Sequence, residues 1–196
     1  ITDWPVDFLS LTEGMNYIWV QVFDNAGNQQ IYPDPFYVKK DTTAPTIENH
    51  QTGDNTWRIT NNGFYDVDFY DANSGSGVRE FQILVSTIGG IDPALIGWTT
   101  FLTTNTYSYT NNWQLPESVW QEIPSGSQKN YVSVRAIDFA YNTSTILTDA
   151  FYVMKDTVPP RVIDNQEGDD VWRRFGGIVY NVDFEDKESL LRGGQY

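Results

Sequence analysis

The stretch FYVKKDTTAPTIENHQTGDNTWRITNNGFYDVDFYD, residues 36–71, recurs later in the chain as FYVMKDTVPPRVIDNQEGDDVWRRFGGIVYNVDFED, residues 151–186. The two copies align without a gap at an offset of 115 residues, and 17 of the 36 aligned pairs are identical. A second block, YIWVQVFDNAGN at residues 17–28, lies over YVSVRAIDFAYN at residues 131–142 at an offset of 114. Because a fixed internal period decides architecture, we predict that the chain is a segment of a tandem array.

Proline-containing stretches set the boundaries between the predicted repeats. Residues 41–45 read DTTAP and residues 156–160 read DTVPP. Proline cannot donate a hydrogen bond to a β-ladder, and it stiffens a linker. We therefore predict one complete repeat at 43–157, the C-terminal part of a preceding repeat at 1–42, and the N-terminal part of a following repeat at 158–196.

The periodicity within the complete repeat is that of β-strands. Apolar and polar side chains alternate over residues 65–70, as they do in a strand with one buried face. Further strand-like runs lie at 78–87, 98–102, 131–137 and 146–155. About seven short strands separated by Gly- and Asn-rich turns are typical of a Greek-key β-sandwich. Only residues 88–96 and 115–122 are candidates for a helical turn.

The block at 17–28 followed by residues 36–47 resembles the junction between two bacterial immunoglobulin-like or hyalin-type repeats. In those families a strand ends in a D-x-A-x-N turn, and D-T-T-A-P or D-T-P-P begins the next module. Ser76-Gly77-Val78 lies where such modules often carry an S-G-V before a central strand. The resemblance implies an all-β fold of immunoglobulin-like Greek-key β-sandwich repeats in tandem, in a large extracellular surface protein of a prokaryote.

The composition excludes several classes of function. With 12 Lys and Arg against 26 Asp and Glu, the formal net charge is −14, which would repel phosphate backbones and anionic lipid. The chain has no cysteine and a single histidine, His50, which excludes thiolate catalysis and Cys- or multi-His metal sites. No apolar run is long enough to span a bilayer, and no catalytic motif is present. We expect no nucleic-acid partner, no membrane insertion by this segment and no enzymatic activity.

Repeated acidic turns suggest calcium. Asx residues of a turn and of a linker recur in the second copy, and hard oxygen ligands near a module junction suit Ca²⁺. The candidate ligands are Asp24, Asn28 and Asp41 in the first copy and Asp138, Asn142 and Asp156 in the second. The alternative needs no ion, because Asx side chains also stabilise tight turns by bonding the local backbone. Asp66 and Asp68 lie on one strand face and are interpreted as part of a solvated sheet face; Asp68 and Asp71 recur as Asp183 and Asp186.

Aromatic residues suggest carbohydrate binding as another function of the chain. Trp98, Trp113 and Trp120 lie in the least repeat-like part of the complete repeat, and exposed, coplanar indoles would stack on sugar rings. Loop packing is the competing interpretation for all three. Trp57 and Trp172 occupy the same place in the two copies and are interpreted as packing elements.

These observations predict a non-catalytic structural repeat of a cell-surface, filament or surface-layer protein, acting as a stalk or assembly module. Its expected partners are neighbouring repeats of the same polypeptide or identical subunits, with contacts at the D-x-A-x-N turns and at the Asp41 and Asp156 linkers. The alternative is an adhesin or carbohydrate-binding module whose ligands are surface glycans. A third idea is that chains complete one another by strand complementation, because the two incomplete repeats carry different parts of the sandwich.

Overall fold

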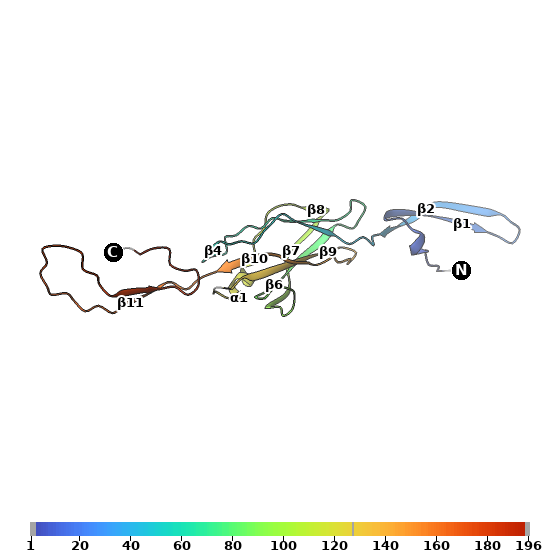
Figure 1. The fold of residues 1–196 in the computed structure, drawn as a ribbon. Coiled ribbons are helices and arrows are strands. Elements are labelled where there is room, and N and C mark those ends of the chain that lie inside the picture. The colour runs from blue at the N-terminus through green and yellow to red at the C-terminus, as the bar shows by residue number, and fades with distance from the viewer. Residues whose placement is uncertain (1–2, 127, 195–196) are drawn as a thin grey trace.

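The computed structural model describes residues 3–126 and 128–194, and most of its regular structure is β-strand (Figure 1). The strands are β1 (Gly14–Phe23), β2 (Gln29–Lys40), β3 (Thr46–Asn49), β4 (Trp57–Arg58), β5 (Val67–Tyr70), β6 (Val78–Ser86), β7 (Ile96–Thr106), β8 (Ser108–Tyr109), β9 (Asn130–Asp138), β10 (Leu147–Lys155), β11 (Arg161–Asp164) and β12 (Val182–Glu185). A 3₁₀ turn, η1 (Phe8–Ser10), and a short helix, α1 (Glu117–Glu122), complete the regular elements. The predicted all-β class is confirmed.

Two sheets in the middle of the chain pack into a β-sandwich. One sheet has the order β4-β10-β9-β6-β7, and the other has the order β3-β5-β8. The pairs are antiparallel except for β4 and β10, which run parallel. Aromatic rings join the layers: Phe69 of β5 stacks on Phe81 of β6, and Tyr65 stacks on Phe151 of β10, each with 4.1 Å between ring centroids.

The alternation in the sequence explains which side chains form this core. Val67 and Phe69 are fully buried, and each such side chain contributes roughly 1.5–3 kcal/mol by leaving water. On β9 the residues that face them, Val132, Val134 and Ala136, are also fully buried. A strand with period two places all of these on one face, so the pattern in the sequence is sufficient to position them.

Of the two candidate helical segments, one contains a helix and the other does not. Residues 115–122 contain α1, as predicted. Residues 88–96 form an irregular loop instead, until β7 begins at Ile96. Gly90 has a φ of +110°, and Pro93 lacks a backbone donor, so the segment cannot continue as an α-helix.

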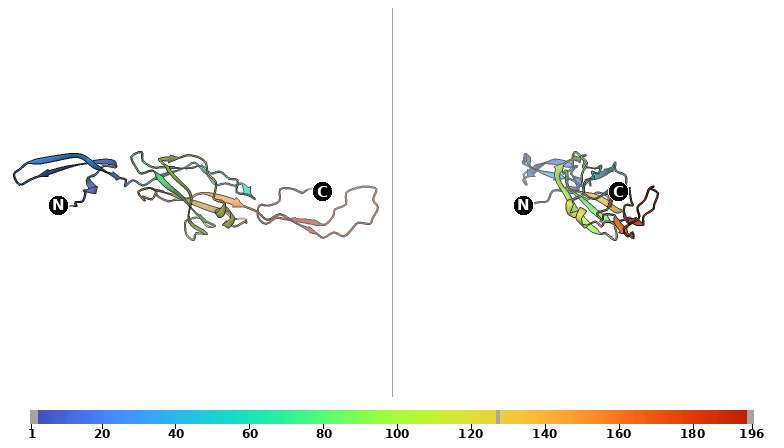
Figure 2. Two further views of the ribbon diagram at one scale, coloured as in Figure 1. Left: turned by 180° about the vertical axis from the view of Figure 1, so that it is seen from behind. Right: turned by 90° about the vertical axis from the view of Figure 1, so that its left-hand side faces the viewer.

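A hairpin projects from each end of the sandwich, and Figure 2 shows both in an elongated molecule. β1 and β2 pair antiparallel in one hairpin, and β11 and β12 in the other. Their apolar faces are open: Phe36 is 41% exposed, whereas its counterpart Phe151 is 2% exposed, and Tyr180 is 51% exposed against 1% for Tyr65. In both hairpins, the counterparts of side chains that are buried in the sandwich are therefore exposed. The division into repeats at 1–42, 43–157 and 158–196 stays a prediction.

Candidate functional site

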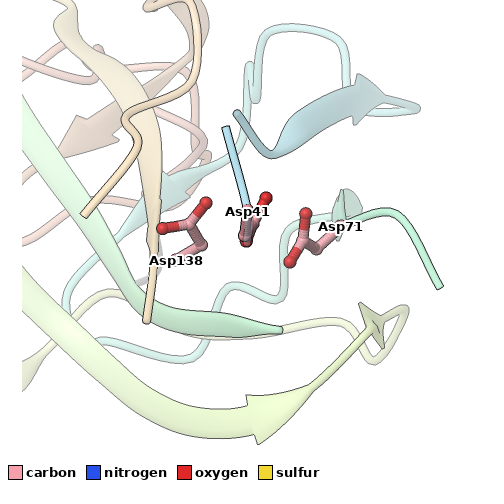
Figure 3. Close-up of side chains that lie close together, drawn as sticks. All are labelled: Asp41, Asp71 and Asp138. Carbon is pink, nitrogen blue, oxygen red and sulfur yellow. The ribbon is translucent and has the colours of Figure 1, made fainter. Parts of the chain in front are cut away.

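Three carboxylates lie together at the end of the sandwich where the β1–β2 hairpin joins it (Figure 3). Asp41 follows β2, Asp71 follows β5, and Asp138 is the last residue of β9. Each offers an oxygen, and these oxygens lie within 4.8 Å of one another. Asp71 and Asp138 are buried, and Asp41 is half-buried. We call these three residues the junction triad.

The Ser-Gly-Ser-Gly turn after β5 holds two members of the junction triad. The backbone N–H of Ser76 donates to Asp41 Oδ2 at 2.7 Å, and that of Gly77 donates to Asp71 Oδ2 at 2.6 Å. Gly77 has a φ of +87°, a conformation that glycine adopts without strain. Successive amides of one turn therefore bind carboxylates that are far apart in the sequence.

The third member is held by the last turn of the sandwich. Asn142 donates to both oxygens of Asp138, from its backbone N–H and from its side-chain amide, each at 2.8 Å. The same amide also donates to the main-chain oxygen of Asp41 at 3.2 Å. This turn has the Asx-turn hydrogen bonds that the sequence suggested as the alternative to an ion.

Burial and mutual repulsion govern the electrostatics of the junction triad. Burial raises the pKa of Asp71, while the amides of Gly77 and Ala72 oppose the rise and the charges of Asp41 and Asp138 add to it. A divalent cation would reverse the repulsive contribution. Carboxylate oxygens are ligands that Ca²⁺ accepts, and an oxygen with one hydrogen bond keeps a second lone pair. The residues present are therefore chemically suited to Ca²⁺.

The six ligands suggested by the sequence do not gather at one place. Asp41, Asp138 and Asn142 meet at the junction triad. Asp24 and Asn28 bond to each other at the tip of the β1–β2 hairpin, in a turn like that of Asp138 and Asn142. A linker aspartate thus meets the last turn of the repeat that follows it.

Asp156 lies at the opposite end of the sandwich, after β10. Its side chain accepts from the backbone N–H of Val158 at 2.9 Å, and a hydrogen bond to it raises the pKa of Glu188. By the repeat alignment, Asp156 and Asp186 are the counterparts of Asp41 and Asp71. Two members of the junction triad therefore recur at the second linker.

Asp71 is the site residue that sequence reasoning missed. Its recurrence as Asp186 was the available signal, but the calcium hypothesis named only residues of the repeated turns and linkers. The structure instead places Asp71 one residue beyond the end of β5 and buries it.

A lysine that is identical in the two copies hydrogen-bonds the start of each linker to the repeat that precedes it. Lys155 is buried, and its Nζ donates to the carbonyl oxygens of Trp120 and Ile123, at 2.7 and 3.0 Å, at the end of α1. Burial lowers the pKa of Lys155. Its counterpart Lys40 donates in the same way to Leu11 O at 2.8 Å. Each linker thus begins with a cation held at the end of a helical turn, where the backbone carbonyls attract it.

The next residues of the first linker also bind the preceding repeat. Thr42 donates from its backbone N–H and hydroxyl to the carboxylate of Glu13, at 2.9 and 2.6 Å, and these bonds lower the pKa of Glu13. In the second linker, Thr157 N–H donates to Ser125 Oγ at 2.8 Å. Both linkers are therefore hydrogen-bonded on the side of the preceding repeat.

The tryptophans do not form a sugar-binding platform. Trp113 and Trp120 are 5% and 3% exposed, so their faces lie in the core and the carbohydrate assignment of these two is wrong. Trp113 donates from Nε1 to Val67 O at 3.1 Å and stacks on Phe101. Trp98 is half-buried, and the guanidinium carbon of Arg135 lies 4.3 Å from the centre of its ring.

Comparisons with known proteins give no relative: no protein-family model matches the sequence, and a search of curated proteins finds no match. In the part of the chain that the structure describes, no helix combines the length and the apolar character needed to cross a membrane. The internal repeat is therefore the relationship on which a functional argument can be built.

Proposed function

We propose that the chain is a non-catalytic structural segment of a tandem array of immunoglobulin-like β-sandwiches. The strand order supports this assignment. β3, β5 and β8 face β10, β9 and β6, and the first part of the repeat contributes to both sheets because β4 pairs parallel with the final strand β10. Immunoglobulin-like sandwiches divide their strands between two sheets in this manner.

The single observation that carries the mechanical role is the double attachment of the first linker. Asp41 accepts from Ser76 in the sandwich that follows, and Thr42 donates to Glu13 in the hairpin that precedes. Two adjacent residues are thus fixed to opposite sides of the junction. Such a linker resists bending, whereas a free linker behaves as a flexible chain.

The proposed setting is the extracellular space or cell surface of a prokaryote, as a stalk, filament or surface layer. The formal charge of −14 keeps crowded arrays soluble through mutual repulsion. Partners would be neighbouring repeats or identical subunits. Calcium at the junction triad stays a hypothesis, and its test is given in the Discussion.

The absence of cysteine allows a direct test of junction stiffness with two spin labels. Gln30→Cys on the hairpin and Glu122→Cys on the sandwich are exposed sites for the labels. We expect a narrow distribution of distances between them by pulsed electron paramagnetic resonance at low protein concentration. Glu13→Ala should broaden it, because Thr42 loses both of its acceptors.

Thr100→Val is the matched control, since it removes a hydroxyl hydrogen bond on the sheet face, away from the junction. It should leave the distribution unchanged. A wild-type distribution as broad as that of Glu13→Ala would overturn the stiff-array proposal.

A further inference from the structure

We infer that Glu48, His50 and Asp68 bind a divalent transition-metal ion, and that Zn²⁺ is the ion whose ligand preferences these side chains match. The inference goes beyond the structural role proposed above and does not depend on it. All three residues belong to the sandwich, so neither terminal hairpin takes part. The site is also distinct from the junction triad, with which it shares no residue.

The pairing of β3 with β5 brings the three side chains to one face of the smaller sheet. Glu48 and Asp68 lie directly opposite each other in the antiparallel register. The backbone N–H of His50 donates to Asp66 O at 3.0 Å and so continues the pairing by one residue. Because side chains alternate along a strand, Glu48 and His50 lie on the same face, away from the core. Three groups that bind metals therefore share one small area.

The imidazole of His50 faces both carboxylates at distances too long for hydrogen bonds. Its Nε2 lies 3.6 Å from Asp68 Oδ2 and 3.7 Å from Glu48 Oε2, whereas an N–H···O hydrogen bond spans about 2.7–3.2 Å. Two ligands of one tetrahedral Zn²⁺, each about 2.0–2.1 Å from the ion, lie about 3.4 Å apart. Small movements would therefore admit an ion, and the exposed Glu48 side chain can turn to supply its oxygen.

The burial of Asp68 points to a cation at this place. A solvated sheet face was the interpretation from the sequence, but the residue is only 7% exposed. Its Oδ2 accepts from Tyr70 OH at 3.0 Å, whereas its Oδ1 is buried and has no hydrogen-bond partner among residues 3–126 and 128–194. A buried carboxylate oxygen without a partner destabilises a fold. A metal ion bound to this carboxylate would offset that cost.

Negative charge accumulates around His50. Like charges directly opposite each other on neighbouring strands destabilise a sheet, and Glu48 faces Asp68 in this way. The hydrogen bond to Asp68 raises the pKa of Tyr70, and burial and the nearby acidic charges add to the rise. In the described part of the chain, no Lys or Arg forms an ion pair with Glu48, Asp66 or Asp68. A dication would reverse the repulsion between these groups.

The second copy of this segment satisfies its aspartate without a histidine. By the repeat alignment, His50 corresponds to Asn165 and Asp68 to Asp183. The side-chain amide of Asn165 donates directly to Asp183 Oδ2 at 2.9 Å, and isoleucine takes the place of Glu48. Metal binding is therefore inferred for the sandwich and not for the second copy.

The donor set favours Zn²⁺ over Ca²⁺. Imidazole is a ligand for Zn²⁺ and its neighbours in the transition series, whereas Ca²⁺ takes oxygen ligands. Zn²⁺ accepts one histidine nitrogen and two carboxylate oxygens, with water in the fourth position. The two acidic clusters of the chain therefore differ in the cation that they would select.

The single histidine of the chain makes the test direct. Imidazole resonances in the ¹H–¹⁵N NMR spectrum of the full chain come from His50 alone, so they report on this site when ZnCl₂ is added to protein dialysed against EDTA. We expect these resonances to shift and to saturate at one equivalent of Zn²⁺. CaCl₂ at the same concentrations should leave them in place, because Ca²⁺ takes oxygen ligands.

Two variants separate metal binding from a role in the fold. Both are compared by isothermal titration calorimetry in an Asp71→Asn background, which removes a carboxylate of the junction triad and should leave the imidazole response unchanged. His50→Asn installs the residue of the second copy and keeps a donor for Asp68, so it should retain the fold and lose the Zn²⁺ site. Glu48→Gln should weaken Zn²⁺ binding at least about tenfold, the loss that follows even from mutating an outer partner of a metal ligand.

Imidazole resonances that do not move up to roughly 1 mM Zn²⁺ would overturn the inference. Equal Zn²⁺ affinities with His50 and with His50→Asn would overturn it as well, because the imidazole would then contribute no ligand. Neither result bears on the tandem-array proposal, which makes no use of these residues.

Discussion

The side-chain amide of Asn142 donates a hydrogen bond to the main-chain oxygen of Asp41 across a sequence separation of 101 residues. The last turn of the sandwich thereby holds the linker through which the chain enters it. The same amide also binds Asp138, so a single side chain connects the linker to the junction triad.

Removing that amide should weaken the sandwich. Asn142→Ala leaves Asp138 Oδ2 and the main-chain oxygen of Asp41 without this donor, while the backbone N–H of residue 142 still donates to Asp138 Oδ1; we expect a loss of roughly 1–3 kcal/mol in the free energy of unfolding. Asn28→Ala is the matched control, because Asn28 makes the same pair of bonds to Asp24 in an exposed turn; water can replace the lost side-chain bond there, so the loss should be about 0.5 kcal/mol. Urea denaturation measures both, and equal losses would contradict the role given to Asn142.

Calcium should stabilise the chain if the junction triad binds it. Binding to the folded state alone raises stability by RT ln(1 + [L]/Kd). We expect the melting temperature to rise with millimolar Ca²⁺ and to fall with EDTA, and we expect no such response in Asp71→Asn or Asp138→Asn. A wild-type midpoint that does not change between EDTA and Ca²⁺ would remove the metal hypothesis.

The raised pKa of Asp71 gives the metal-free chain a defined pH dependence. Burial favours the protonated form in the folded state, so the folded state binds more protons than the unfolded state at pH values above 3.8, the ordinary pKa of aspartate. Stability should therefore decrease as the pH rises through the folded-state pKa of Asp71. Asp71→Asn should lack this component, as measured by urea denaturation in EDTA at a series of pH values.

Other carboxylates affect the stability of the fold at lower pH. The hydrogen bond from Arg173 lowers the pKa of Asp169, and the one from Asn28 lowers that of Asp24. Their stabilising effect is present above pH 3.8 and disappears below it as they become protonated. Identical pH profiles for the wild type and Asp71→Asn above pH 3.8 would show that Asp71 contributes nothing.

Lys155 should matter more than its counterpart Lys40. Lys155→Met keeps the aliphatic stem but leaves the carbonyl oxygens of Trp120 and Ile123 without their donor, and we expect a loss of about 2–3 kcal/mol. Lys40→Met acts on a half-buried site at the edge of the first hairpin, where water replaces the lost donor. Comparison of the two urea midpoints tests this difference, which a purely local helix-capping effect would not produce.

Identical residues in the two copies should respond differently to truncation. Phe69→Ala removes a fully buried ring and should cost about 3–5 kcal/mol. Phe184→Ala removes its exposed counterpart, and stability should change by no more than about 0.5 kcal/mol. Thermal melts at low protein concentration compare the stabilities of the two variants. Similar losses would mean that the second hairpin has a core of its own.

The strands were predictable because they depend on local alternation, and Val67 and Phe69 face the core as the pattern requires. The junction triad was less predictable. Asp41 and Asp138 were each visible as Asx residues at a turn or linker, but their meeting depends on how the end of β9 lies beside the entering linker. No local pattern contains that information, and Asp71 joins them only because β5 ends one residue earlier.

The tryptophans show a second limit of prediction from the sequence. Trp113 and Trp120 lie in a segment with little repeat similarity, which made them candidates for carbohydrate binding beside the competing interpretation of loop packing. The segment nevertheless closes the sandwich core, and the burial of both rings follows from tertiary packing. Sequence variation between repeats therefore does not mark exposed positions in this chain.

The long-range bond between Asn142 and Asp41 has a consequence for synthesis. A ribosome completes Asp41 long before Asn142, so the linker cannot acquire its final hydrogen bonds until the last turn of the following repeat has been made. In the tandem array proposed above, each joint would become rigid one repeat late. A flexible zone about one repeat long would then travel just behind the point of elongation while the older part of the array is already stiff.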